Sequence, residues 1–294
     1  MCAVGCPGRR AEGKGGAMRA FRPFRPVIAA MLGVVLAIMV VVAPAYAVTG
    51  GQPDNGAHPQ VGFILAPDVG FCSGTLIAPT VVLTAVHCTY SFTQYGVAEL
   101  LVSFDAQVTD ASTFISAYEW YSHPDYVDAN WPFTVDVGVV ILSEPVDLPV
   151  GELPYAGLLD DLIPEQDASQ QTFTDVGYGQ TGVDTGGGPP QPAFPLERRF
   201  STQTYHPGGN EMVGVIHGFD ELLLMLKANP SSRHGSGCGG DSGGPIFLGD
   251  TYTIVAIHTG GYRLGIDGAL CGRLSSLNHR IDTPVVLNWL YQFL

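Results

Sequence analysis

The sequence predicts an all-β fold that ends in a helix. Short apolar runs rich in β-branched residues recur along the chain, and turn residues separate them at close intervals. The 294 residues include 38 glycines and 22 prolines, which is typical of a β protein with many loops. Amphipathic helical periodicity is absent from the sequence until the end of the chain.

Eight segments carry the strand signal. In chain order they are Val61–Leu65, Thr80–Thr84, Leu100–Phe104, Val135–Leu142, Thr172–Val176, Leu222–Leu226, Pro245–Leu248 and Tyr252–His258. The polar, proline-punctuated stretch Leu158–Gln171 follows the fourth segment, and we expect it to connect two halves of the fold. The glycine-rich stretch Gly182–Pro195 is predicted to be a loop.

A helix is predicted over residues 283–294. Thr283 is a suitable N-cap, and Pro284 suits the first helical position because its missing N–H needs no partner there. The apolar residues that follow recur with helical spacing and mark one face. They are Val285, Val286, Trp289, Leu290 and Phe293.

Residues 1–47 are interpreted as a signal peptide and not as part of the fold. Three arginines precede the apolar run Val27–Ala43, and Ala45-Tyr46-Ala47 suits signal peptidase. A retained membrane anchor is the alternative, because a run of this length can span a tilted or thinned bilayer. Residues 1–17 resemble neither a signal nor a domain, so Met18 is a candidate start. We expect a secreted protein that meets the membrane only in transit.

The charge of the chain argues against one class of partner. The formal net charge is −14, and it becomes −19 after residue 47 because the leader holds six of the 13 basic residues. Proteins that bind nucleic acids present basic surfaces, so no nucleic-acid partner is expected. The remaining 247 residues are enough for one large domain or two packed barrels.

Four of the six cysteines follow the leader: Cys72, Cys88, Cys238 and Cys271. An even number in a secreted chain predicts disulfides, but four cysteines allow three connectivities. Zinc sites are marked by spacings such as CxxC and HxxxH, which the sequence lacks. No metal or cofactor is implied.

The stretch Gly240–Pro245, with sequence Gly-Asp-Ser-Gly-Gly-Pro, carries the strongest chemical signal. Its glycines allow a tight turn that brings the backbone close to a substrate, although a glycine-rich turn can also be purely structural. Ser242 would need a base to remove its proton and an anion to orient that base. The stretch also fits the nucleophile elbow of α/β-hydrolases. That fold needs the order Ser, acid, His and alternating strands and helices, which this sequence does not have.

A histidine and an aspartate upstream stand in suitable positions. His87 follows a β-branched run and precedes Cys88, whereas Asp136 interrupts an apolar segment, where a buried carboxylate is costly unless it is hydrogen-bonded. Taken singly, His87 is more often a structural histidine, and Asp136 can be a turn residue before a strand.

Together, these segments resemble the chymotrypsin/trypsin family of serine endopeptidases, in which the chain order is also His, Asp, Ser. His123–Tyr126 is similar to the family's His-Pro-x-Tyr, and Val176–Gly179 is similar to the Gly-aromatic-Gly at the start of its second barrel. The resemblance covers nearly all of the chain after residue 47.

The resemblance implies a trypsin-like peptidase domain over residues 48–294. Two six-stranded antiparallel β-barrels are expected, at about 58–160 and about 171–280, followed by the C-terminal helix. The resemblance also implies the disulfides Cys72–Cys88, which would brace the loop of His87, and Cys238–Cys271. We expect a monomer that acts on protein or peptide substrates.

The resemblance further implies a role for each catalytic residue. Ser242 would attack the substrate and form an acyl-enzyme, His87 would carry the proton, and Asp136 would orient His87. The N–H groups of Gly240 and Ser242 would stabilise the oxyanion.

Asp241 would be buried beside this turn, so it needs a cation. In the family, the cation is the α-amino group of a newly cut N-terminus. Cleavage after Ala47 would expose Val48-Thr49-Gly50-Gly51, which is similar to the family's Ile-Val-Gly-Gly. We therefore predict that Val48 and Asp241 pair without a separate pro-peptide.

Ser236, Thr259 and Gly261 resemble positions of the family's primary specificity pocket. Ser236 replaces the aspartate of trypsin-like members, so Lys or Arg before the cut is disfavoured. His258 lies in Ile-His-Thr-Gly-Gly, similar to bacterial glutamyl endopeptidases, and an imidazole can bind a carboxylate. A core histidine bonded to the backbone is the alternative. Glu and apolar residues therefore both remain candidates for the position before the cut.

The sequence thus predicts a secreted serine endopeptidase. A catalytically inactive binding protein on the same fold is the competing hypothesis, although such proteins often lose one of the three catalytic residues, and all three are present here.

Overall fold

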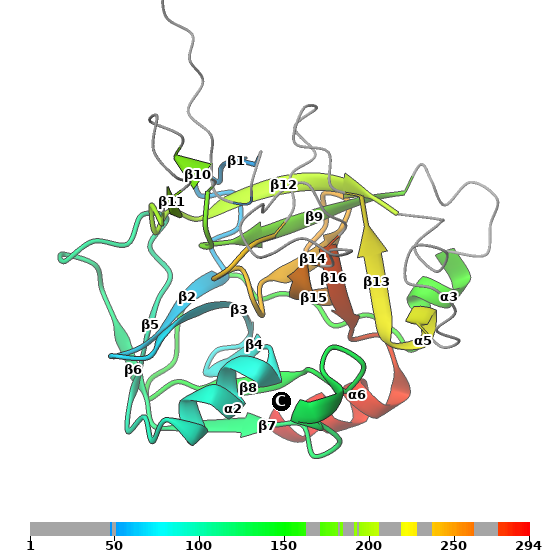
Figure 1. The fold of residues 1–294 in the computed structure, drawn as a ribbon, viewed down its shortest axis with the longest axis horizontal. Helices are drawn as coiled ribbons and strands as arrows, with labels where there is room; N and C mark the ends of the chain where they lie inside the picture. Colours follow the sequence, from blue (N-terminus) through cyan, green and yellow to red (C-terminus); the bar gives the residue numbers. More distant parts are fainter. Residues whose placement is uncertain are drawn as a thin grey trace, which may run out of the picture. The chain divides into compact units, whose positions relative to one another are not determined.

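The computed structural model describes residues 48, 51–162, 171–181, 183–184, 191–192, 194–205, 219–227, 237–261 and 276–294. It consists mostly of strands in two seven-stranded sheets, and a helix lies near its end (Figure 1). The prediction of an all-β fold with a C-terminal helix is confirmed. Over these residues, no helix has the length and apolar character needed to cross a membrane. The predicted leader lies outside the described residues.

The first sheet is antiparallel and has the order β6-β5-β2-β3-β4-β8-β7. Its strands are β2 (Val61–Ala66), β3 (Gly70–Ala78), β4 (Val81–Thr84), β5 (Leu100–Ser103), β6 (Ile115–Ala117), β7 (Glu119–Ser122) and β8 (Gly138–Ile141). Only Tyr118 separates β6 from β7 in the chain, yet these strands are the two edges of the sheet. The edges therefore meet, and the sheet is a nearly closed barrel.

The second sheet has the order β1-β12-β9-β14-β15-β16-β13 and forms a half-barrel. Its strands are β1 (Gln52–Pro53), β9 (Thr172–Gly177), β12 (Arg199–Thr204), β13 (Leu223–Leu226), β14 (Pro245–Leu248), β15 (Ile254–Gly261) and β16 (Ser276–Arg280). Two short strands, β10 (Val183–Asp184) and β11 (Gln191–Pro192), pair separately. The expected barrel boundaries stay a prediction. The strands of the two sheets occupy residues 61–141 and, apart from β1, 172–280.

The helices in the described ranges are short. They are α2 (Val86–Gln94), α3 (Leu158–Leu162), α5 (Phe219–Leu222) and α6 (Pro284–Leu290), with 3-10 turns η1 (Asp128–Asn130) and η3 (Tyr291–Phe293). In α6 the hydroxyl of Thr283 accepts a hydrogen bond from the N–H of Val286, as an N-cap does. Helix α2 packs against β7 and β8 (Figure 1). The sequence did not predict it, because its nine residues contain few strong helix formers.

The sequence missed β3, β6, β7, β12 and β16, and two of these, β12 and β16, bury many polar residues. In β12 the residues alternate between buried and half-buried, and the buried ones are Arg199, Ser201 and Gln203. All five residues of β16 are buried, although four of them are polar. An apolar pattern cannot identify such strands, because the interior of the second sheet is partly polar.

Candidate active site

His87 and Asp136 are joined by two hydrogen bonds. Asp136 lies just before β8, whose partner strand β4 leads into α2, so the pairing of these strands brings the aspartate to the first turn of the helix. One carboxylate oxygen, Oδ1, accepts from the backbone N–H of His87 at 2.8 Å, and Oδ2 lies 2.7 Å from its ring Nδ1. Asp136 is fully buried, whereas the His87 side chain is 25% exposed. A carboxylate at Nδ1 keeps the proton there and leaves Nε2 free to act as a base.

The predicted disulfide between Cys72 and Cys88 is present, with a Cα–Cα distance of 6.5 Å. It joins β3 to α2 at the residue that follows His87, so it holds the start of the helix against the sheet. The sequence predicted this pairing from family resemblance alone.

Ser242 lies in a turn that packs against the first sheet. Its carbonyl oxygen accepts from the N–H of Ser73 at 2.9 Å. Gly243 has a φ of +78°, and a Cβ at this position would lie 2.1 Å from the hydroxyl of Thr84. The turn therefore sits against the end of β4, three residues before His87, and only glycine fits at position 243.

Two N–H groups of the same turn make no backbone hydrogen bond to the described residues. Within the turn, the N–H groups of Asp241 and Gly244 donate to backbone carbonyls. That of Gly243 donates to the backbone carbonyl oxygen of His258. In the described part of the chain, no backbone hydrogen bond starts from the N–H of Gly240 or Ser242. Two such donors side by side can stabilise an oxyanion.

Asp241 and Asp175 form a pair of buried carboxyl groups. Asp241 accepts from the N–H of Gly179 at 2.7 Å and from that of Cys238 at 2.8 Å. Burial raises the pKa of Asp241 to about 7. Burial and the Asp241 carboxylate raise the pKa of Asp175 well above its usual value, while hydrogen bonds from Gln203 and the Gly237 backbone lower it. Among the described residues, no ion pair includes either carboxylate, so none of these residues supplies the pair with a cation.

Val48, the predicted partner of Asp241, is buried, and its carbonyl oxygen accepts from the N–H of Gly51 at 2.5 Å. The described residues after it lead into β1, which pairs with β12 of the second sheet.

The predicted specificity residues are described only in part. His258 on β15 is 1% exposed, and its ring packs so closely on Gly237 that a Cβ there would lie 2.2 Å from Cε1. Burial lowers the pKa of His258 to about 4. Thr259 is buried next to it, and Gly261 ends the strand. Ser236 lies outside the described residues.

The second predicted disulfide is also described only in part. Cys238 is disulfide-bonded, but its predicted partner Cys271 lies outside the described residues.

Trp131 is a site residue that the sequence analysis missed. Its indole lies edge-on to the His87 ring, with 6.1 Å between the ring centroids. A Cβ on Gly260 would lie 3.1 Å from Cζ2 of the same indole. Through these contacts the side chain reaches from the loop before β8 to β15. It is 42% exposed. Its position between His123 and Asp136 was the only signal in the sequence.

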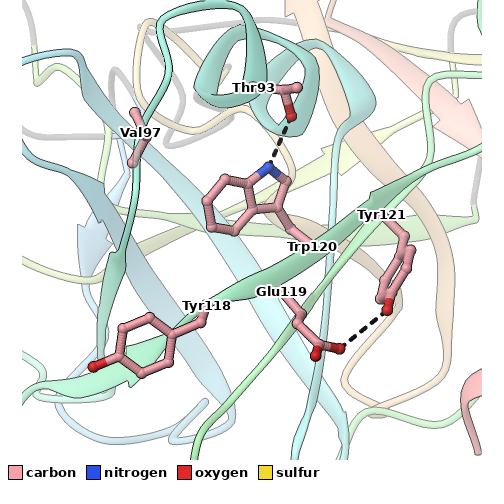
Figure 2. Close-up of a pocket in the computed structure, with 6 residues that line it drawn as sticks. All are labelled: Thr93, Val97, Tyr118, Glu119, Trp120 and Tyr121. Carbon is pink, nitrogen blue, oxygen red and sulfur yellow. Dashed lines mark hydrogen bonds between the residues drawn. The ribbon is translucent and has the colours of Figure 1, made fainter.

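A separate hollow of about 480 Å³ lies at the other end of α2 (Figure 2). It is lined by Thr93, Val97, Tyr118, Glu119, Trp120 and Tyr121. The indole Nε1 of Trp120 donates to the hydroxyl of Thr93 at 2.9 Å (Figure 2). Thr93 is six residues from His87, about 9 Å along a helix, so this hollow is distinct from the predicted site. Over the described ranges, no cluster of three or more His, Cys, Asp or Glu side chains is suited to a metal ion.

Comparisons with known proteins show which chains this one is similar to. Residues 47–271 match the family model described as Trypsin. A trypsin from Saccharopolyspora erythraea is 30% identical over 203 residues, which cover 68% of this chain and 82% of the relative. A brachyurin from Leptuca pugilator is 29% identical over 211 residues, covering 69% and 82%. Scolexin B from Heliothis virescens is 29% identical over 203 residues, covering 64% of each chain.

Proposed function

Because the chain belongs to the trypsin family of serine endopeptidases, we propose that Ser242, His87 and Asp136 are its catalytic residues. The chain is a serine-type endopeptidase that acts on protein or peptide substrates. The observation that carries the assignment is the pair of hydrogen bonds that Asp136 accepts from His87. The turn of Ser242 packs on Thr84, three residues before His87.

In the proposed reaction, Oγ of Ser242 attacks the carbonyl carbon of the scissile peptide bond. Nε2 of His87 takes the hydroxyl proton and passes it to the leaving amine, and an acyl-enzyme remains. Water then loses a proton to the same nitrogen and hydrolyses the ester. The N–H groups of Gly240 and Ser242 stabilise the oxyanion in both steps.

The test uses the chain beginning at Val48 and its Ser242→Ala variant, with Ser143→Ala as the matched control on an exposed serine. We expect peptide cleavage, and labelling by a serine-reactive phosphonate, in the parent and the control only. A folded parent chain that is neither active nor labelled would support the competing hypothesis of an inactive binding protein.

We propose that the residue before the cut is Glu or apolar, and not Lys or Arg. Ser236 offers no carboxylate to a basic side chain, and the buried ring of His258 is the candidate contact for an acidic one. A peptide library varied at this position tests the proposal. Dominant cleavage after Lys or Arg would contradict it.

We also propose that activity begins when the α-amino group of Val48 pairs with Asp241. Three observations support this pairing. Asp241 is fully buried, the pKa of its carboxyl group is raised, and no cation among the described residues pairs with it. One added residue before Val48 should abolish cleavage, whereas one added residue after the exposed Leu294 should not. Full activity of the first form would refute the pairing.

Export as a monomer through the leader is the remaining part of the proposal. Protein recovered from the medium should begin at Val48 and sediment as a monomer. A form that keeps residues 1–47 in the membrane fraction would favour the anchor instead.

A further inference from the structure

Five buried side chains form one hydrogen-bonded chain across the interior of the second sheet. They are His258 on β15, Asn278 and Ser276 on β16, Gln203 on β12 and Asp175 on β9, and none is more than 1% exposed. From His258 to Asp175, the four successive distances are 3.3, 3.0, 3.0 and 2.9 Å. We call these five residues the relay.

Each hydrogen bond in the relay has one direction when Asp175 is ionised. The amide Nδ2 of Asn278 also donates to the carbonyl oxygen of Leu224 at 3.1 Å, and a carbonyl can only accept. The oxygen Oδ1 of Asn278 therefore faces His258, whose Nδ1 must donate to it. At the other end, an ionised Asp175 can only accept, so Nε2 of Gln203 donates to it and Oε1 of Gln203 accepts from the hydroxyl of Ser276.

Each donor in the relay consequently points away from His258 and toward Asp175. The negative ends of both amide dipoles face the imidazole, and the positive ends face the carboxyl group. This alignment favours a positive charge on His258 and a negative charge on Asp175, and hydrogen bonds in series reinforce one another. Because Nδ1 is held by Asn278, Nε2 is the ring nitrogen left for a ligand.

The charged groups around the two ends determine when His258 can be protonated. Burial lowers the pKa of His258, and the nearby His87 lowers it further, whereas Asn278 and Asp136 raise it. At the far end, Asp175 faces Asp241. His258 is therefore neutral without a ligand at neutral pH, and an anionic group beside Nε2 would supply the charge that imidazolium needs.

We propose that the relay makes His258 the receptor for a carboxylate side chain of the substrate, and that Asp175 is the distant positioning residue that stabilises the charged form. When the acidic side chain enters, Nε2 takes one proton from solvent and pairs with the carboxylate. This inference rests on the proposed function, because it needs His258 to face the specificity pocket.

The first experiment compares paired substrates with Glu or Gln before the cut, which differ in charge and little in shape. Asp175→Asn removes the charge and Gln203→Met breaks the relay, while Thr174→Val is the matched control. Thr174 precedes Asp175 in β9, is buried, and bonds to Gly249 outside the relay. We expect the parent chain to prefer Glu, and both relay variants to lower the ratio of kcat/KM between Glu and Gln about tenfold, mainly through KM, as a shift of one pKa unit would.

The outcomes separate this inference from the proposed function. A folded parent chain with no activity would overturn both. An active parent without a preference for Glu would overturn the relay alone. The relay is also overturned if its variants behave like Thr174→Val, or if they slow both substrates equally, as a purely structural network would.

A second measurement needs no change in the relay, so it remains decisive if those variants do not fold. Calorimetry of the Ser242→Ala variant with a Glu substrate, in two buffers of different ionisation enthalpy, reports the protons bound. We expect uptake of about one proton at neutral pH with Glu and none with Gln. Equal uptake with the two substrates would refute the inference.

Discussion

At the scale of single residues, the two oxygens of Asp136 have different tasks, and this leads to a prediction. Oδ1 accepts from a backbone N–H, which cannot become an acceptor, while Oδ2 faces Nδ1 of His87. In Asp136→Asn, the amide oxygen must stay at the backbone, so the NH₂ group faces Nδ1 and moves the ring proton to Nε2. His87 is then unable to accept the proton of Ser242, and we expect kcat to fall about 10⁴-fold.

Peptide hydrolysis at neutral pH measures this effect, with Asp125→Asn as a control on an exposed aspartate near the same motif. A loss of kcat smaller than tenfold would show that Asp136 does not set the tautomer of His87.

The same scale shows what the sequence can and cannot reveal about the site. Ser242, His87 and Asp136 could be proposed because acyl transfer needs those residue types in glycine-rich or buried surroundings. Trp131 could not, because its role depends on contact with His87 and Gly260, which are distant in the chain.

At the scale of elements, Arg198 lies just before β12 and joins the two sheets. We predict a large loss of stability when its counter-ion is removed. Its guanidinium is buried and donates to Asp54 at 2.8 Å, and also to the carbonyl oxygens of Val61 and Phe104. Asp54→Ala would leave this buried charge without a counter-ion. We expect the free energy of unfolding to fall by about 3–5 kcal/mol, measured by urea denaturation at pH 7.

The control for this prediction is Asp147→Ala, which removes an exposed aspartate and should change stability by less than about 0.5 kcal/mol. Equal, small effects of both substitutions would mean that water or another group neutralises Arg198.

Strands with continuous apolar runs could be predicted from the sequence most closely, whereas two strands with many buried polar residues were missed. β14 was predicted with its observed bounds, and β2 to within one residue, because apolar residues mark them. β12 and β16 were missed because they bury Gln203, Ser276 and Asn278, which have hydrogen-bond partners on other strands. The polar interior that hid these strands from sequence analysis is the same interior that forms the relay.

At the scale of the whole molecule, buried histidines predict how stability depends on pH. Burial lowers the pKa values of His258 and His279 to about 4 each, and neither ring nitrogen of His279 has a hydrogen-bond partner among the described residues. In the unfolded chain these groups titrate near 6.5. Between pH 6.5 and 4 the unfolded state therefore binds more protons than the folded state, so this contribution is complete above 6.5 and falls as the pH falls toward 4.

Asp241 acts in the opposite direction over part of this range. As long as the α-amino group of Val48 does not pair with it, its folded pKa of about 7 lies above the unfolded value, so its contribution is present at low pH and is lost as the pH rises toward 7. The pH profile of the parent chain alone would mix the two effects. A difference between the parent chain and a variant that changes one histidine cancels the contribution of Asp241.

The variant is His279→Leu, which removes one titrating group and its two buried ring nitrogens from β16. The stability of this variant relative to the parent should increase by about 3 kcal/mol as the pH falls from 6.5 to 4. The reason is that only the parent contains His279, which takes up its proton more readily in the unfolded chain. Urea denaturation at several pH values measures this difference, and Leu277→Met, two residues away, should show no such trend. A constant difference across the range would mean that His279 is protonated in the folded chain, and that the interior of the second sheet is open to solvent protons.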